Sequence, residues 1–251
     1  MLFRSQGCSP EQIAGRLTRA YPDDMRKHLS TETISVGLYV LPRGTLRSEL
    51  LTALRQARKA RRPRARGIDR RGQLPNLTPI VERPAEVATR TVPGHWEGDL
   101  LKGARNGSAV GTLVERTTRL VLLARMDGTD ATSARQGFTK KLRRVPAPLR
   151  KTLTYDRGKE MAEHAHLAER LAIRVFFADP HSPWQRGTNE NTNGLLRQYL
   201  PKGTDLSGYT QRELNAIAHR LNTRPRKCLH FATPLEVYAQ LRHHSPVALG
   251  T

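Results

Sequence analysis

The stretch "VPGHWEGDLLKG", residues 92–103, is where the sequence pattern changes, and it decides the fold. It holds the first of three short strand candidates, and turn signals at residues 103–107 and 117–119 separate them. We therefore predict a meander of three strands, at residues 95–103, 108–118 and 119–126.

Downstream of the meander, helices and strands alternate. A helix is predicted at residues 130–145, because Ala131, Ala134, Phe138 and Leu142 fall on one stripe. A meander followed by alternating helices and strands predicts an α/β fold with a mixed sheet flanked by helices. The remaining elements are expected to be a buried strand at 152–156, a helix at 159–172 and a strand at 174–179.

Two short helices are predicted upstream. In "SPEQIAGRL", residues 9–17, Ser9 is the expected N-cap, Pro10 takes the first helical position and Gln12 completes a capping box. A second helix is predicted at residues 31–41. Its first turns present three short polar side chains, Thr31, Thr33 and Ser35, which suits a helix-turn-helix that reads DNA. A plain helical hairpin fits the same spacing.

The chain is strongly basic. Lys and Arg number 43 against 22 Asp and Glu, which gives a formal charge of +21. This excess indicates a polyanionic partner, nucleic acid more often than an acidic membrane surface, although a generally arginine-rich composition is the alternative. Nine Lys or Arg lie in residues 55–71. We expect this arm to neutralise DNA phosphates through Arg61, Arg62, Arg64 and Arg66, the alternative being a solvated linker.

The sequence also indicates where the protein acts. No apolar run approaches the roughly 18 residues of a membrane span, no signal peptide is evident, and Cys8 and Cys228 lie far apart. We expect a soluble intracellular protein with reduced thiols and no membrane partner.

The patterns described so far divide the chain into four expected parts. They are a helical DNA-binding segment at 1–54, a basic linker at 55–91, a catalytic core at 92–242 and a tail at 243–251.

Two carboxylates occupy places that favour chemistry. Asp99 lies inside the first strand candidate, and Asp156 ends the strand at residues 152–156. Active sites in α/β sheets gather at the carboxyl ends of strands. A buried carboxylate without a cation is costly, so a metal ion is a natural partner for both. The alternative for Asp156 is a role in capping the next loop.

A third carboxylate stands in "DPHSPWQRGTNENTNG", residues 179–194, where three asparagines surround Glu190. If residues 187–200 form a helix, its apolar face holds Leu195 and Leu196, and Glu190 points the other way. We expect these three asparagines to form a polar collar around Glu190. The collar would keep competing charges away from Glu190 and let a phosphate and a hard metal ion approach it. Carboxylate and phosphate oxygens are the ligands that Mg²⁺ prefers, and paired ions serve phosphoryl transfer.

Three motifs together resemble one family. "HWEGDLLKG", "YDRGKEMAEH" and "DPHSPWQRGTNENTNGLLRQYLPKGTDLS" are similar to the catalytic signature of the insertion sequence thirty family of DDE transposases. The core of that family resembles the RNase H-like fold of retroviral integrases. The resemblance runs from about Ser9 to about Tyr238. It implies that Asp99, Asp156 and Glu190 form the catalytic, metal-binding triad, with 33 residues between the last two.

The resemblance implies a transposase that acts in the bacterial cytoplasm, associated with the nucleoid. Its cofactor would be Mg²⁺, with Mn²⁺ as a substitute, and it would cleave the ends of an insertion sequence and transfer them to target DNA. Its partner would be double-stranded DNA, bound as a homo-oligomer. Two other hypotheses remain open, a catalytically inactive DNA-binding regulator or transposase remnant, and an RNase H-like nuclease without strand transfer.

Further residues receive secondary assignments. We predict DNA contacts from Gln185, Arg186, Asn193 and Arg197. His164 is either an accessory to the metal site or a satisfied surface histidine, and Trp184 is predicted to be a packing anchor rather than a base-stacking platform. Members of the family carry a longer N-terminal region, whereas eight residues precede "SPEQIAGRL" here, so we expect a truncated reading frame.

Overall fold

The computed structural model describes residues 8–39, 77–180 and 182–244. Contacts divide the chain into two compact units, Met1–Asp69 with Thr223–Val237, and Arg70–Asn222 with Tyr238–Thr251. The predicted parts, with boundaries at residues 54, 91 and 242, stay a prediction; in this division, residues 223–237 belong with the N-terminal unit. No helix in the described part of the chain is long and apolar enough to cross a membrane.

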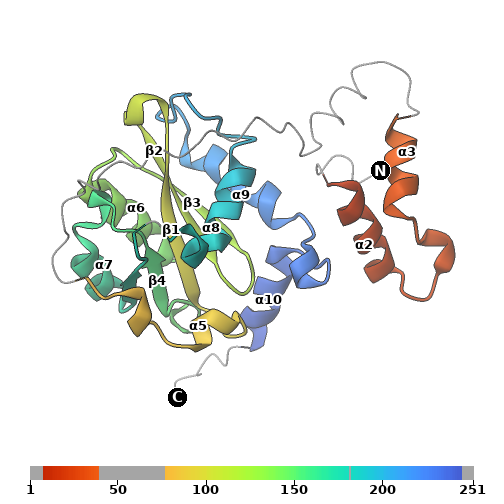
Figure 1. Ribbon diagram of the computed structural model, residues 1–251, viewed down its shortest axis with the longest axis horizontal. Coiled ribbons are helices and arrows are strands. Elements are labelled where there is room, and N and C mark those ends of the chain that lie inside the picture. The colour runs from red at the N-terminus through yellow and green to blue at the C-terminus, as the bar shows by residue number, and fades with distance from the viewer. Residues whose placement is uncertain (1–7, 40–76, 181, 245–251) are drawn as a thin grey trace. The chain divides into compact units, whose positions relative to one another are not determined.

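The larger unit is built on a five-stranded sheet in the order β3-β2-β1-β4-β5 (Figure 1). The β1–β2 and β2–β3 pairs are antiparallel, whereas the β1–β4 and β4–β5 pairs are parallel. This confirms the predicted mixed sheet of the RNase H-like class. The strands are β1 (His95–Lys102), β2 (Ala109–Glu115), β3 (Val121–Arg125), β4 (Thr152–Tyr155) and β5 (Arg174–Phe177).

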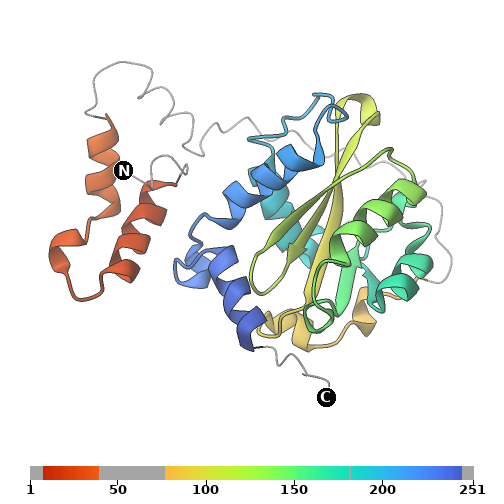
Figure 2. The ribbon, with the colours of Figure 1, turned by 180° about the vertical axis from the view of Figure 1, so that it is seen from behind.

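Helices cover both faces of the sheet (Figures 1 and 2). One core contains apolar residues of α6 (Ala131–Leu142) and α7 (His164–Leu171), and the other contains those of α8 (Gly187–Leu196) and α9 (Gln211–Asn222). Trp96 and Leu100 of β1 belong to the first core and Leu101 to the second. Because side chains alternate along a strand, Glu97 and Asp99 face the side of α8.

The predicted helix stripe at the start of α6 is confirmed, since Ala134, Phe138 and Leu142 are buried and Asp130 caps the helix through the Ser133 amide, 2.9 Å away. The single helix predicted at residues 159–172 is wrong at its start. The chain instead makes the 3₁₀ turn η5 (Lys159–Met161), closed by i to i+3 hydrogen bonds, before α7 begins. This tighter turn buries the adjacent Glu160 and Met161.

Shorter elements connect these helices and strands. They are η2 (Ile80–Glu82), α5 (Glu86–Thr89), η3 (Ala104–Asn106), η4 (Ala147–Leu149) and η6 (Pro183–Arg186), with α10 (Pro234–His244) near the end of the chain.

The smaller unit contains α2 (Pro10–Ala20), η1 (Met25–Lys27), α3 (Thr31–Tyr39) and η7 (Lys227–Leu229). The predicted capping box is present, because the Ser9 amide donates to Gln12 Oε1 at 2.9 Å and the Gln12 amide donates to Ser9 Oγ at 3.3 Å. Helix α3 ends at Tyr39, and residues 40–41 of the predicted helix lie outside the described residues.

Helix α2 is held by the segment 223–237. Arg16 pairs with Glu236, and Gln12 Nε2 donates to the Pro225 carbonyl at 2.9 Å. The ring of Phe231 lies directly over Gly15, so a Cβ at that position would meet ring carbons at 2.4 Å. Residue 15 must therefore lack a side chain for the ring to sit there.

We expect Gly15→Ala to destabilise the smaller unit by about 1–3 kcal/mol, because the Phe231 ring must shift to admit the methyl group. Gly37→Ala in α3 is the matched control, since its added Cβ would meet nothing within 4 Å. A helical Gly→Ala change in open space is expected to stabilise by about 0.5–1 kcal/mol. Hydrogen exchange of the α2 amides measures both, and equal protection in the two variants would contradict the packing described.

Candidate active site

Two neighbouring parallel strands bring two carboxylates together. In the β1–β4 pairing Glu97 lies opposite Thr154, and the same register continued by two residues places Asp99 opposite Asp156. Asp156 directly follows β4, and paired strands lie about 4.8 Å apart. Both side chains consequently project on the face that α8 covers.

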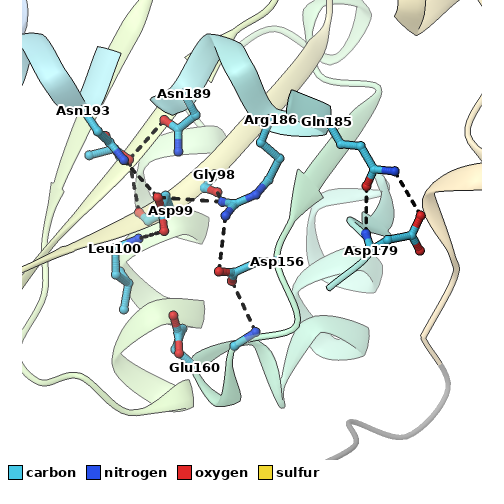
Figure 3. Close-up of polar contacts among 12 residues, drawn as sticks. Gly98, Asp99, Leu100, Asp156, Glu160, Asp179, Gln185, Arg186, Asn189 and Asn193 are labelled. Carbon is cyan, nitrogen blue, oxygen red and sulfur yellow. Dashed lines mark hydrogen bonds and ion pairs between the residues drawn. The ribbon is translucent and has the colours of Figure 1, made fainter. Parts of the chain in front are cut away.

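One guanidinium joins these carboxylates (Figure 3). Arg186 Nη2 lies 3.2 Å from Asp156 Oδ2, and Nη1 lies 3.8 Å from Asp99 Oδ2. Nη1 also donates to the Gly98 carbonyl at 3.1 Å. Arg186 ends η6, immediately before α8, so the cation comes from the same stretch that carries Glu190.

Asp99 is the more buried of the two acids, with 23% of its side chain exposed against 30% for Asp156. Its carboxylate accepts from the Leu100 amide at 2.9 Å and from Asn193 Nδ2 at 2.9 Å. Burial raises the pKa of Asp99 to about 6, and the charge of Asp156 adds to the rise, although Arg186 opposes it. The site therefore favours the arrival of a proton or a further cation.

The oxygen atoms at this site fit a hard divalent cation as ligands. Asp99 and Asp156 supply carboxylate oxygens, and Asn193 Oδ1 is a buried oxygen without a hydrogen-bond partner. Magnesium prefers such oxygen ligands and completes its shell with water or phosphate oxygens.

Glu190 lies on the exposed face of α8. Leu195 and Leu196 are buried on the opposite face, which confirms the predicted orientation of the helix. In residues 8–39, 77–180 and 182–244, no ion pair joins Glu190 to Arg186, the cation that links Asp99 and Asp156. Nor does any group of three or more His, Cys, Asp or Glu side chains there have an arrangement that holds a metal. The structure thus brings two of the three predicted ligands together, and the place of Glu190 in the triad stays a prediction.

A buried ion pair that the sequence analysis missed fixes the start of α8. Glu97 is fully buried and pairs with Arg116, whose side chain is 5% exposed. The second oxygen of Glu97 accepts from the Asn189 amide at 2.8 Å, in the first turn of α8. A carboxylate at this position satisfies an amide that has no partner within the helix. Its position two residues before Asp99, on the same strand face, is the signal that sequence reasoning had available.

The asparagines do not form the predicted collar. Asn189 is fully buried, and its Oδ1 accepts from the Thr112 hydroxyl of β2 at 3.2 Å. Asn193 is bound to Asp99 instead of lying free beside Glu190. The collar prediction is wrong for these two residues, because they attach α8 to the sheet.

A further carboxylate, Glu160 of η5, was also missed. It is 9% exposed, lies 4.0 Å from Lys102 Nζ, and contributes to the raised pKa of Asp99. Nearby, the Tyr155 ring packs against Gly98, where an added Cβ would lie 2.8 Å from Tyr155 Cδ2. A glycine beside Asp99 therefore lets the buried tyrosine support the strand that carries this acid.

The predicted DNA contacts near the site are engaged within the protein. Gln185 Nε2 donates to Asp179 Oδ2 at 2.9 Å, and Gln185 Oε1 accepts from the Asp179 amide at 2.8 Å. Arg197 directly follows α8. Its guanidinium donates to the Leu200 carbonyl at 3.3 Å and to the Lys102 carbonyl of β1 at 3.2 Å. These bonds give both side chains a structural role in the absence of DNA.

In the smaller unit, Thr31 and Thr33 are exposed at the start of α3, and Thr33 Oγ1 lies 2.8 Å from Ser30 Oγ. The Ser35 hydroxyl donates to the Thr31 carbonyl at 2.8 Å. The predicted contacts Arg61, Arg62, Arg64 and Arg66 lie outside the described residues.

His164 and Trp184 differ from their predicted settings. His164 is 8% exposed, its Nδ1 lies 3.0 Å from the Met161 carbonyl, and its ring meets Phe177 edge to face at 4.9 Å. The surface-histidine alternative is therefore wrong. Trp184 is 73% exposed, so its prediction as a packing anchor is also wrong.

Comparison with known proteins gives a consistent picture. Residues 90–183 match the family model of the integrase core domain. The transposase for insertion sequence element IS1086 of Cupriavidus metallidurans is 59% identical over 239 residues, covering 95% of this chain and 70% of that protein. Transposase InsI for IS30A of Escherichia coli is 46% identical over 232 residues, covering 91% of this chain and 60% of that protein. The transposase for insertion sequence element IS4351 of Bacteroides fragilis is 37% identical over 250 residues, covering 98% of this chain and 73% of that protein.

The raised pKa of Asp99 predicts a pH-dependent stability. Because the folded-state pKa is about 6 against a reference of 3.8, the folded state holds the proton more tightly. Stability is then highest below about pH 4 for this group and falls as pH rises to about 6, by at most about 3 kcal/mol. Asp99→Asn removes this loss, and Asn193 can turn its unpartnered oxygen toward the new amide. Urea unfolding from pH 4 to 8, without divalent cations, should show the variant gaining on the wild type as pH rises, and parallel curves would refute the assignment.

The buried Glu97–Arg116 pair predicts a loss of folding stability when one of its charges is removed. Glu97→Gln leaves Arg116 buried without its counter-charge, and we expect a loss of about 3–5 kcal/mol. Glu86→Gln is the control, because Glu86 is 47% exposed in its contact with His95, and its loss should stay below about 1 kcal/mol. Chemical unfolding measures both variants. Equal losses would show that the Glu97 pair does not anchor α8.

Proposed function

We propose that this chain, which belongs to the insertion sequence thirty (IS30) family of DDE transposases, cleaves the ends of an insertion sequence and transfers them to target DNA. The observation that carries this proposal is the pairing of Asp99 and Asp156 on neighbouring parallel strands, with the helix that bears Glu190 attached beside them. Carboxylates gathered at strand ends suit phosphoryl transfer, in which positioning and charge neutralisation provide most of the catalysis.

An integrase-type core of this family depends on divalent metal ions. We propose that the ion is Mg²⁺, with Mn²⁺ as a substitute, and that Asp99, Asp156 and Glu190 hold it. When bound, such an ion activates the attacking oxygen and neutralises charge on the phosphate. The carboxylates meet the preference of Mg²⁺ for hard oxygen ligands.

The surrounding residues prepare the site. Asn193 orients one oxygen of Asp99, and the Asp156 carboxylate accepts from the Gly158 amide at 3.2 Å. The Glu97–Arg116 pair fixes the first turn of α8, the turn that carries Glu190. A site held by such supporting bonds needs little rearrangement when substrate arrives.

We propose double-stranded DNA, as element ends and target, for the partner, bound by a homo-oligomer. The formal charge of +21 supports this partner. Thr31, Thr33 and Ser35 of α3 and the arm at residues 55–71 are the proposed contacts outside the core, with Gln185, Arg186, Asn193 and Arg197 near the carboxylates. The exposed Trp184 offers a flat surface on which an unpaired base can stack.

Asp156→Asn is expected to separate binding from chemistry, because the amide keeps the shape of the side chain but loses the charge that holds a divalent ion. Gel-shift affinity for duplex DNA should persist, while end cleavage and joining with Mg²⁺ or Mn²⁺ should fall to background. Asp179→Asn is the control, since this surface acid contacts Arg157 and Gln185 and should leave cleavage intact.

The outcomes separate the hypotheses. Cleavage without joining by the wild type indicates a nuclease, and binding without either step indicates a regulator or remnant. Full cleavage and joining by Asp156→Asn would remove this residue from the active site.

The basic arm is expected to supply affinity that does not depend on sequence. Each phosphate contact contributes about −0.9 to the slope of log affinity against log salt concentration. Replacing Arg61, Arg62, Arg64 and Arg66 with Ala should flatten that slope by about 3–4 and weaken binding to all duplexes alike. Salt titrations on two unrelated duplexes measure this change, and an unchanged slope would reduce the arm to a linker.

A further inference from the structure

Arg186 occupies the position of a cation between the two paired acids. Its guanidinium lies within 4 Å of oxygens from both Asp99 and Asp156, and its side chain is 12% exposed (Figure 3). A positive charge held this close to two acids neutralises part of the repulsion between them. Arg186 is therefore a counter-ion of these two acids.

A guanidinium and a divalent ion cannot share these oxygens without penalty. Arg carries five N–H donors and no acceptor, so it offers nothing to a metal ion. Both cations would lie within a few ångströms of one another, where like charges repel. Either Arg186 weakens metal binding by staying, or it leaves when the metal arrives.

The remaining contacts of Arg186 allow it to leave. In the described part of the chain its further partners are the Gly98 carbonyl, at 3.1 Å, and the face of the Tyr155 ring, with 6.0 Å to the ring centre. Both are neutral. The next residue is Gly187, at which an added Cβ would meet nothing within 4 Å, so there is open space on that side of the chain next to Arg186.

We propose that Arg186 is a displaceable counter-ion, which holds Asp99 and Asp156 together before the divalent ion binds and then moves to a phosphate of the bound DNA. This inference rests on the proposed function. A guanidinium binds phosphate through two parallel hydrogen bonds, and phosphate is the anion that the substrate brings to this place. The displacement thus couples metal binding to DNA binding through one side chain.

Arg157 provides a matched control within the same region. Its Nη2 pairs with Asp179 Oδ1 at 3.3 Å, and both side chains are well exposed, 39% and 49%. Arg157→Gln removes the same charge as Arg186→Gln, one residue away from Asp156. Any effect of net charge alone should appear equally in both variants.

The first measurement is Mn²⁺ affinity of the DNA-free protein, followed by the electron paramagnetic resonance signal of free Mn²⁺. Removal of a competing cation should tighten binding in Arg186→Gln by about tenfold, whereas Arg157→Gln should change it by less than about threefold. Arg186→Lys keeps the positive charge but replaces the forked guanidinium with a single ammonium group. Its Mn²⁺ affinity should lie between those of the wild type and Arg186→Gln. This variant also keeps the test valid if Arg186→Gln fails to fold.

The second measurement is affinity for a duplex of arbitrary sequence with and without Mg²⁺. The ratio of the two affinities should be larger for the wild type than for Arg186→Gln by about threefold, because only the wild type gains a phosphate contact when the arginine is released. Arg157→Gln should keep the wild-type ratio.

The results distinguish this inference from the proposed function. Equal or weaker Mn²⁺ binding by Arg186→Gln and Arg186→Lys, with the wild type still binding Mn²⁺ and cleaving DNA, overturns the counter-ion role alone. Failure of the wild type to bind Mn²⁺ overturns the metal site and this inference together. Tighter Mn²⁺ binding with an unchanged DNA ratio overturns the transfer to phosphate.

Discussion

The constraint on which the site depends is the parallel register of β1 and β4, which places Asp99 and Asp156 side by side on one face of the sheet. Burial raises the pKa of Asp99 to about 6, and the negative charge of Asp156 adds to the rise. The neighbouring contacts lessen the penalty of burial. Arg186 supplies positive charge, while the Leu100 amide and Asn193 donate hydrogen bonds.

Helix α8 is attached to this face through polar bonds as well as apolar packing. Leu195 and Leu196 bury one side of it in the second core. Its first turn is bound by Glu97 through the Asn189 amide, and Glu97 is in turn paired with Arg116. A buried ion pair is weak evidence for stability, but the loss of one partner is severe. The arrangement therefore specifies one position of the helix, and with it the position of Glu190.

Residue patterns predicted the parts of this structure that depend on local periodicity. The five strands were predicted from short runs between turn signals, and the α6 stripe and the outward face of Glu190 from helical spacing. All of these are properties of neighbouring residues. Asp156 at the end of a buried strand was visible for the same reason. The break between η5 and α7 was not predicted, because the helical pattern continues through residues that the tertiary structure places in a tighter turn.

The roles of individual polar side chains were harder to predict. Whether Asn189 faces solvent or Thr112, and whether Arg186 faces DNA or two acids, depends on partners that lie far away in sequence. Glu97 was overlooked because its partner is Arg116 on the other side of a turn, and nothing in the spacing identifies that pair. Trp184 was expected to be a packing anchor, yet its side chain in η6 is exposed.

The central claim is that Asp99 and Asp156 hold one divalent ion between them. The most direct measurement is a crystal structure of the protein soaked in Mn²⁺, with the ion located by its anomalous scattering. We expect a peak about 2.2 Å from a carboxylate oxygen of each acid, with the Arg186 guanidinium displaced from between them. A fully occupied ion bound to only one of the two acids, or bound elsewhere while both remain paired with Arg186, would contradict it.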